Sequence, residues 1–366
     1  MNSIDNKELH NYGIDLLRVI SMLMIIAHHI SIHGEVSLDI INANYILLKA
    51  VLPLGGKTAV NIFILITGYY VSKQPTVKMH KIMNLIFKMT LFSLILTGMA
   101  AVFGIVPISK KLFIKALFPV LFGNNYWFVI TYIELILIAP LLNIVINGIT
   151  NRQFKRYLMG AIIAFCIFPT VFGQMIEIND LGNSNLVWFV IMYFIGAYAR
   201  EYVKEIKNKS VLYAGGTLTL ITFHVLASIF CLLVNEAGMG YSMLKVFADY
   251  QLNSIMSLLI AVGLFMLFMG IDFPKNNMLL IVGKCTLGVY LFHDNVNFRS
   301  FLWSSIIDLN KQYHSNIFPV YVLLDIIGVF AIGMMLDLFV TFIIEKIFCE
   351  KFYIWCASKF KDGEYS

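Results

Sequence analysis

Residues 12–34 read YGIDLLRVISMLMIIAHHISIHG, and this stretch decides the fold class. It is apolar and long enough to cross a bilayer as a helix, which takes about 20 such residues. Two ionisable side chains inside it, Arg18 and His29, are expensive in lipid and are therefore candidates for function. They are eleven residues apart. That separation is three helical turns plus about 20°, so both lie on one helix face, about 16 Å apart along the axis.

The composition of the whole chain indicates the same class. Of its 366 residues, 59% are hydrophobic and 13% are charged, and the mean hydropathy is +0.81. Soluble domains of this length do not have such a composition. We therefore expect an all-α polytopic membrane protein with about ten transmembrane helices. It is expected to form a single domain over residues 1–366, with short tails at about 1–13 and 345–366.

Cysteines and net charge exclude other classes. The five cysteines show no CxxC or CxxH spacing, so neither a disulfide framework nor a metal site is expected. The net charge of +6 comes from the loops and does not indicate nucleic-acid binding.

Hydropathy places the expected spans along the chain. They cover residues 14–32, 44–72, 82–106, 126–147, 156–173, 185–199, 211–234, 254–271, 278–297 and 317–344. The second span is expected to be broken near Pro53, Gly55 and Gly56, because proline lacks the backbone N–H that a continuous helix needs.

The loops between the spans alternate in charge. Loops such as SKQPTVKMHK (72–81) are basic, whereas others such as HGEVSLD (33–39) are acidic or nearly neutral, and ISKKLFIK (108–115) is the one clear exception. The positive-inside rule then places both termini in the cytoplasm of a plasma-membrane protein. In this orientation His29 falls in the outer half of the membrane and Arg18 near the inner surface.

Arg18 and His29 each have a structural and a functional interpretation. Arg18 either snorkels to the surface beside Asp15 or holds a phosphate or carbonyl oxygen with its planar fork. His29 either hydrogen-bonds a neighbouring helix or acts as general base for a hydroxyl, because imidazole exchanges a proton near neutral pH. His28 points about 100° away, so only His29 shares the face of Arg18.

The stretch YWFVITYIELILIAPLLN (126–143) adds three candidates. Glu134 is the only acid near the middle of this span, and it is either paired with a cation of another helix or an orienting group for His29 or for the bound acceptor. Tyr126 and Trp127 either belong to the aromatic belt of the membrane interface or stack against a sugar ring.

Two further segments carry polar side chains inside or at the end of a span. AVNIFILITGYYVSK contains Asn61 and Tyr69, and Asn61 is expected to hydrogen-bond between helices. GKCTLGVYLFHDNVN contains His293, Asp294 and Asn295 at the expected outer end of its span. These are either ordinary boundary residues or part of a site for an acceptor.

Taken together and in order, four segments resemble the acyltransferase 3 family. They are YGIDLLRVISMLMIIAHH (12–29), NIFILITGYYVSK (61–73), NNYWFVITYIELILIAPLLN (124–143) and LGVYLFHDN (287–295). Thr67 stands where the second family segment usually has serine, which is a mild departure.

The resemblance implies an integral membrane O-acyltransferase that modifies cell-surface glycans. It implies acetyl-CoA as a donor from the cytosol, a sugar hydroxyl as the acceptor on the outer side, and Arg18 with His29 as the essential pair. The expected partners are therefore the acyl-CoA donor, a sugar or polysaccharide, and membrane lipid. A polysaccharide-synthesis complex or a homo-oligomer is compatible with this expectation.

These expectations assign the candidate residues to three roles. The catalytic candidates are His29, Arg18 and Glu134. The candidates for contact with the acceptor are Tyr126, Trp127, His293, Asn295, Asn61 and Tyr69. The candidates for holding the phosphates of the donor are Arg18, Arg152, Arg156 and Arg200. The positive-inside rule alone also accounts for the last three.

Two other classes of function remain open at this stage. A transporter or flippase for glycans or small solutes would also need polar residues in the membrane. It would, however, often show inverted repeats of broken helices, and none is evident in the sequence. A scaffold in a polysaccharide-synthesis complex would tolerate replacement of His29.

Overall fold

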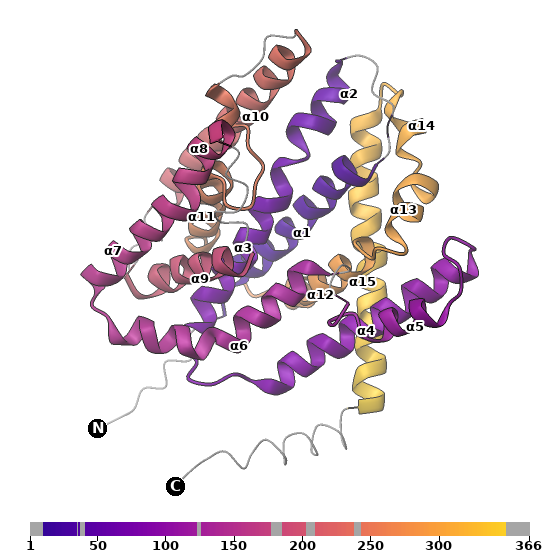
Figure 1. Cartoon of the computed structure of the whole chain (residues 1–366), viewed down its shortest axis with the longest axis horizontal. Coiled ribbons are helices and arrows are strands. Elements are labelled where there is room, and N and C mark those ends of the chain that lie inside the picture. The colour runs from indigo at the N-terminus through magenta and orange to yellow at the C-terminus, as the bar shows by residue number, and fades with distance from the viewer. Residues whose placement is uncertain are drawn as a thin grey trace.

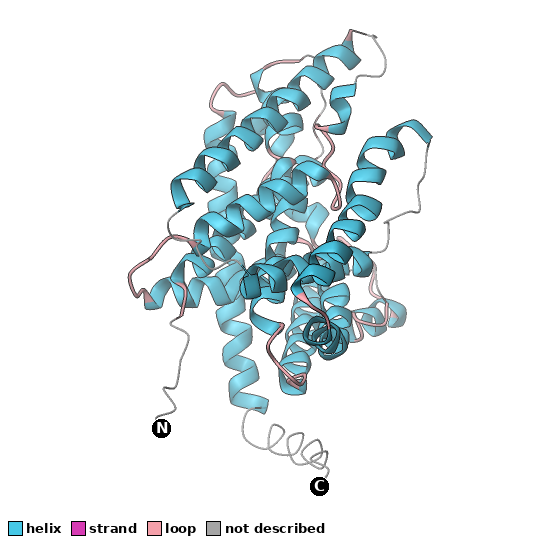
Figure 2. Cartoon of the chain, turned by 90° about the vertical axis from the view of Figure 1, so that its left-hand side faces the viewer, coloured by secondary structure: helices cyan, strands magenta, loops and turns pink. Residues whose placement is uncertain are grey.

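The computed structural model describes residues 10–34, 36, 41–122, 126–176, 185–202, 209–237 and 243–348, and within these ranges the chain forms helices and no strands (Figure 2). The first part of the chain forms α1 (Tyr12–His33), α2 (Ala43–Ile46), a π-helical turn (Leu47–Val51), α3 (Leu54–Val71), α4 (Met79–Val102), α5 (Lys110–Leu117) and α6 (Trp127–Gly148). The middle part forms α7 (Asn151–Ile162), a second π-helical turn (Ile163–Ile167), α8 (Phe168–Ile176), α9 (Asn185–Tyr202), α10 (Ser210–Glu236) and a 3-10 turn (Met243–Val246). The last part forms α11 (Ile255–Met269), α12 (Asn277–His293), α13 (Arg299–Phe301), a third π-helical turn (Leu302–Ile306), α14 (Leu309–Tyr313) and α15 (Phe318–Phe348).

The helices confirm the predicted class, an all-α polytopic membrane protein. Seven helical stretches in the described part of the chain are long and apolar enough to cross a membrane. They are Tyr12–His33, Ala43–Val71, Met79–Val102, Trp127–Gly148, Asn151–Phe172, Ser210–Asn235 and Phe318–Ile344. The exact count of ten is not established. α11 and α12 have 15 and 17 residues, and at about 1.5 Å per residue they fall short of a hydrocarbon layer about 30 Å thick.

The predicted break at Pro53 is visible as an irregular stretch between α2 and α3. The chain stays helical from Ala43 to Val71, but residues Leu47–Val51 form a π-helical turn in which Leu52 N–H donates to the Leu47 carbonyl. Such turns occur where a helix accommodates an irregularity, and they are frequent at functional sites.

α1 lies in the interior of the bundle, in contact with α3, α11, α12 and α15 (Figure 1). Its first turn is capped by Asn11, whose side chain accepts from the Ile14 N–H at 3.3 Å. α1 and α12 run in the same direction: Gly283 near the start of α12 lies beside Asp15, and the ring of His293 at its end lies 4.9 Å from that of His29. The helix face that carries Arg18 and His29, the polar stripe of α1, therefore faces protein along its length.

Small residues bring α3 and α9 into backbone contact. A Cβ atom on Gly68 would lie 2.1 Å from the Tyr193 carbonyl oxygen, and one on Gly196 would lie 2.2 Å from the Leu65 carbonyl oxygen. Membrane helices associate through such close contacts because lipid supplies no hydrophobic driving force between them.

We expect Gly68→Val to lower the thermal stability of the purified protein strongly, because α3 and α9 must separate to admit the side chain. Overpacking a close interface costs roughly 1–3 kcal/mol. Gly98→Val in α4 is the matched control, since nothing lies within 4 Å of a Cβ atom there. The measurement is the melting temperature in detergent. Equal melting temperatures for the two variants would contradict the packing described here.

A buried ion pair holds α12 in place from its other side. Lys88 Nζ of α4 lies 2.8 Å from Oδ1 of Asp337 in α15, and Asp337 is buried. Asp337 packs directly on Gly288 of α12, where a Cβ atom would lie 2.0 Å from its Oδ1. Charges inside a membrane protein are stable when paired in this way, and the pair fixes the wall that α12 contributes to the site described next.

Candidate active site

One cavity of about 480 Å³ lies along the polar stripe of α1. α1, α3, α6 and α12 supply most of its wall, with single residues from α4 and α13. Its charged and imidazole side chains are Arg18, His28, His29, His33, Lys57, Lys284, Asp294 and Arg299. Its aromatic side chains are Phe63, Trp127, Phe128, Tyr132 and Tyr290.

Arg18 and His29 both line this cavity, as their shared helix face predicts. Arg18 donates from Nη1 to Oδ1 of Asp15 at 2.8 Å. Asp15 is buried and also contacts His10. The predicted pairing with Asp15 is therefore present, and Arg18 lines the cavity at the same time. Because a guanidinium has five N–H donors, one bond to Asp15 leaves others for a ligand.

His28 lines the same cavity although it points in a different direction from His29. Its Nδ1 donates to the Pro53 carbonyl at 3.1 Å, and its ring rests on Gly56, where a Cβ atom would lie 2.3 Å from ring carbons. His28 therefore ties α1 to the irregular stretch before α3. Sequence spacing alone did not predict this, because the cavity curves around more than one face of α1.

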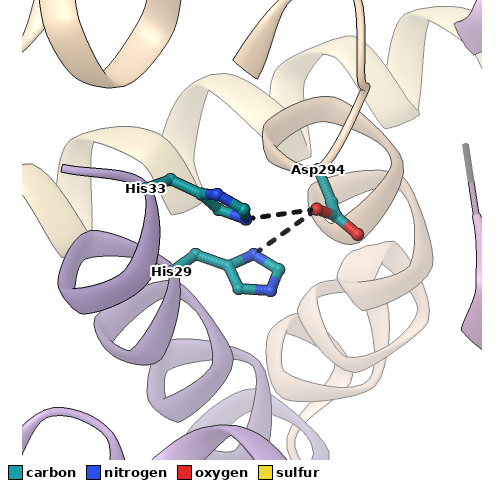
Figure 3. Close-up of side chains that lie close together, drawn as sticks. All are labelled: His29, His33 and Asp294. Carbon is teal, nitrogen blue, oxygen red and sulfur yellow. Dashed lines mark ion pairs between the residues drawn. The ribbon is translucent and has the colours of Figure 1, made fainter. Parts of the chain in front are cut away.

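At the His29 end of the cavity an aspartate lies beside two histidines (Figure 3), and an arginine contacts the same aspartate. Oδ1 of Asp294 lies 4.0 Å from Nδ1 of His29 and 3.8 Å from Nε2 of His33. Nη1 of Arg299 lies 3.3 Å from the same oxygen. His29 and His33 sit one turn apart on α1, whereas Asp294 follows the last residue of α12.

Tyr126 and Asn295 fix the loop that carries Asp294. The Tyr126 hydroxyl donates to the Leu291 carbonyl at 3.1 Å and accepts from Asn295 Nδ2 at 2.8 Å. Both side chains are fully buried. Asn297 adds a bond from Nδ2 to the Thr97 hydroxyl at 2.9 Å, which joins the loop to α4. The structure thus gives Tyr126 and Asn295 protein partners near the His29 end of the site.

The cavity wall carries more positive than negative charge. Four of its residues are cations, Arg18, Lys57, Lys284 and Arg299, and Asp294 is the one carboxylate among the described residues that line it. Lys57 Nζ lies 4.8 Å from the ring centroid of Trp127, a cation–π contact. The cavity is therefore suited to a ligand that bears negative charge.

Glu134 lies on an exposed face of α6 and is not among the residues that line the cavity. The structure therefore does not bring it to His29, and the carboxylate beside His29 is Asp294. The reason is geometric: Phe128 and Tyr132 lie on the face of α6 that meets the cavity, and Glu134 points about 120° and about 160° away from them around the helix.

Asn61 and Tyr69 are held by protein groups. Asn61 donates to the Leu252 carbonyl at 2.9 Å and accepts from Trp188 Nε1 at 2.8 Å, so it joins helices as its cost in lipid predicts. Tyr69 lies at the other end of α3, where Arg200 donates to its carbonyl at 2.8 Å. The Arg200 side chain also lies over the Tyr69 ring, with Cζ 5.6 Å from its centroid.

The remaining arginine candidates lie away from the cavity. Arg152 and Arg156 are exposed on α7, and neither lines the cavity. Arg200 satisfies carbonyls at the C-terminal end of α3, a common position for a cation because the last carbonyls of a helix have no partner within it. Of the four arginines assigned to the donor, the structure brings only Arg18 to the cavity.

Sequence reasoning missed Lys57, Tyr132, Lys284 and Arg299. Lys57 had a usable signal, since it is a charged residue within the apolar stretch 44–72 and intramembrane charges mark functional sites. Lys284 had the same signal, because it lies within the expected span 278–297. Tyr132 had none, because its position at the cavity depends on how α6 packs in the bundle.

The fold and the site define the class: a polytopic all-α membrane protein with a cationic, histidine-lined cavity among its helices. The profile of the acyltransferase domain of the acyltransferase 3 family matches residues 11–343, nearly the whole chain, so the protein belongs to this family and is a membrane acyltransferase. Comparisons with curated proteins and with solved structures find no match.

Proposed function

We propose that the protein is an O-acetyltransferase that moves an acetyl group from cytosolic acetyl-CoA to a hydroxyl of a cell-surface polysaccharide or of its lipid-linked precursor. The observation that carries this proposal is the cavity that Arg18 and His29 share in a chain that belongs to an acyltransferase family. The acetyl group and the sugar acceptor are what the resemblance of the sequence to this family implies, and a cationic cavity with aromatic side chains in its wall is compatible with them.

The inner end of the cavity is the proposed site of the donor. Arg18 and Lys284 line it there, with Gly283 of α12 beside Asp15 of α1. Phosphate and carbonyl oxygens accept charge-assisted hydrogen bonds from such side chains. We assign the donor to these two residues rather than to Arg152, Arg156 or Arg200, which do not line the cavity.

The outer end is the proposed site of the acceptor. Trp127 offers an aromatic face, with Lys57 next to it, and His29 and His33 supply imidazole groups. Because Arg18 and His29 line one cavity, a donor held at the Arg18 end can extend its acyl group toward His29. His293 packs its ring 4.9 Å from that of His29 and supports it from α12.

The proposed reaction is a direct transfer with His29 as general base. The imidazole takes the proton of the sugar hydroxyl while the oxygen attacks the thioester carbonyl carbon of acetyl-CoA, and a C–O bond forms. The C–S bond then breaks, and the imidazolium returns its proton to the departing CoA thiolate. Arg18 stabilises the donor by hydrogen bonds to its phosphate oxygens, because it lies about 16 Å from His29 along α1, too far to reach the acyl oxygen attacked there.

The proposal places the protein in the plasma membrane with both termini in the cytoplasm. This orientation follows from the basic loops and gives the Arg18 end of the cavity access to cytosolic acetyl-CoA. The partners are the acyl-CoA donor, the glycan acceptor and membrane lipid. Work within a polysaccharide-synthesis complex or as a homo-oligomer is compatible with this role.

Reporter fusions test the orientation. A fusion at residue 366 is expected to report the cytoplasm, and one within residues 174–184 is expected to report the outside, because these segments fall on opposite sides of the charge pattern. The measurement is paired alkaline phosphatase and green fluorescent protein activity. Reports from the same side at both sites would contradict the proposed orientation.

The test of the function is a comparison of cells with and without the gene. Surface polysaccharide from each is purified, and proton NMR records O-acetyl signals before and after mild alkaline treatment. The proposal predicts alkali-labile acetyl signals that disappear with the gene and return on complementation. Unchanged acetylation with altered export of polysaccharide would overturn the proposal in favour of a transporter.

A further inference from the structure

The Nδ1 atom of His29 is a buried polar atom whose neighbours include a carboxylate. It has no hydrogen-bond partner within the described part of the chain, and Oδ1 of Asp294 lies 4.0 Å away. Figure 3 shows Nδ1 turned toward this oxygen and the second ring nitrogen turned away from it. Catalytic hydrogen bonds are often long before substrate binds and shorten in the reactive complex.

Asp294 is held rigidly enough to orient a neighbour. Its side chain is 6% exposed, and its N–H donates to the Tyr290 carbonyl at 3.1 Å. The next residue is anchored to Tyr126, as described above. Arg299 donates to Oδ1 at 3.3 Å and balances the charge of the carboxylate. Positioning groups of this kind work because their own partners fix them.

A metal ion is the competing explanation for this cluster. His29, His33 and Asp294 each offer a ligand atom, and these atoms lie within 4.8 Å of one another. Zinc ligands bind at about 2.0–2.2 Å and surround the ion closely. Here, however, the Arg299 guanidinium already contacts Oδ1 of Asp294, and the Lys57 ammonium also lines the cavity. Because these two positive charges lie beside the cluster, binding of a divalent metal ion by His29, His33 and Asp294 is disfavoured.

We propose that Asp294 is a positioning residue for His29, one that accepts a hydrogen bond from Nδ1–H and so keeps Nε2 free to take the acceptor's proton. This inference rests on the proposed function of His29 as general base. The tautomer of a histidine is set by the hydrogen bond that its other nitrogen makes. Asp294 fills the role that the sequence assigned to Glu134.

The test compares Asp294→Asn with the wild type. His29 and Arg299 approach the same oxygen, Oδ1. In the variant this oxygen belongs to a neutral amide, a weaker acceptor than a carboxylate, which no longer holds the proton on Nδ1, so the imidazole is expected to shift to the form with the proton on Nε2. A change of this kind lowers turnover by trapping the wrong tautomer. We expect turnover to fall by roughly tenfold to a hundredfold, by analogy with loss of the partners that orient metal-binding histidines. The KM for acetyl-CoA is expected to stay unchanged.

Solid-state NMR of ¹⁵N-histidine-labelled protein in lipid bilayers reads the tautomer directly. The His29 signals are assigned by their loss in His29→Gln. The wild type is expected to show Nδ1–H with a bare Nε2, and Asp294→Asn is expected to show Nε2–H. Asp308→Asn is the matched control, since Asp308 lies outside the cavity lining. Asp294→Glu keeps a carboxylate at this position and is expected to show the wild-type tautomer.

The two readouts separate this inference from the proposed function. An identical His29 tautomer in wild type and Asp294→Asn overturns the inference, whatever the activity. A changed tautomer with unchanged turnover also overturns it. One equivalent of zinc in the purified protein, lost in His33→Ala, overturns it in favour of a metal site. Absence of transfer by the wild type would refute the proposed function. The tautomer measurement would still show whether Asp294 accepts a hydrogen bond from His29.

Discussion

His29→Ala is expected to abolish transfer, because the proposed base at the centre of the cavity is then missing. A positioned general base contributes about 10²- to 10⁴-fold to rate, so the variant is expected to lose at least about a hundredfold in turnover. The measurement is O-acetylation of surface polysaccharide, normalised to the amount of folded protein in the membrane.

His28→Ala is the informative comparison. His28 donates to the Pro53 carbonyl and packs on Gly56, so its loss is expected to lower thermal stability, by about 1 kcal/mol for the lost hydrogen bond. Turnover per folded molecule should change far less than in His29→Ala. Equal losses of turnover in the two variants, or none in His29→Ala, would remove His29 as the base.

Arg18→Lys is expected to reduce transfer by about ten- to a hundredfold, which corresponds to loss of one charge-assisted hydrogen bond of roughly 1.5–3 kcal/mol. Lysine keeps a charge for the buried Asp15, with which Arg18 is paired at 2.8 Å. It lacks the planar fork that holds Asp15 and an oxygen of the donor at once. The measurement is the rate of transfer by purified protein in nanodiscs over a range of acetyl-CoA concentrations.

Arg152→Lys is the control for this prediction, because Arg152 is exposed on α7 and does not line the cavity. It is expected to behave like the wild type. If Arg18→Lys shows normal turnover and normal donor dependence, then Arg18 serves only as the partner of Asp15. A loss in Arg152→Lys equal to that in Arg18→Lys would move the donor site to α7.

The sequence predicted the features that depend on one helix. Apolar length and composition predicted the all-α membrane fold, and helical periodicity predicted that Arg18 and His29 face the same side. The structure places both in one cavity. The irregular helix around Pro53 was also predictable, because proline lacks the N–H that a regular helix requires.

Features that depend on packing between helices were not predictable in this way. Glu134 and Asp294 are both carboxylates in or beside expected spans, and nothing in the sequence decides which one approaches His29. The outcome depends on the side of α6 that faces α1 and on the height at which α12 ends. Because of where α12 ends, Asp294 lies 4.0 Å from Nδ1 of His29, whereas Glu134 points away from the cavity.

The number of spans was uncertain for a related reason. α11 and α12 are apolar but have 15 and 17 residues, and hydropathy measures how apolar a segment is more reliably than where its helix ends. α12 ends at His293, and the chain continues into the loop that carries Asp294. This early end of the helix places polar groups within the protein beside α1.

The measurement that tests the central claim most directly uses purified protein, [1-¹³C]acetyl-CoA, and surface polysaccharide of the producing cells from which O-acetyl groups have been removed by mild alkali. With the protein in nanodiscs, ¹³C NMR is expected to show new ester carbonyl signals on the polysaccharide. One CoA thiol should be released for each ester, and neither product should form with His29→Ala. No ester from the wild type, or equal ester from His29→Ala, would contradict the account.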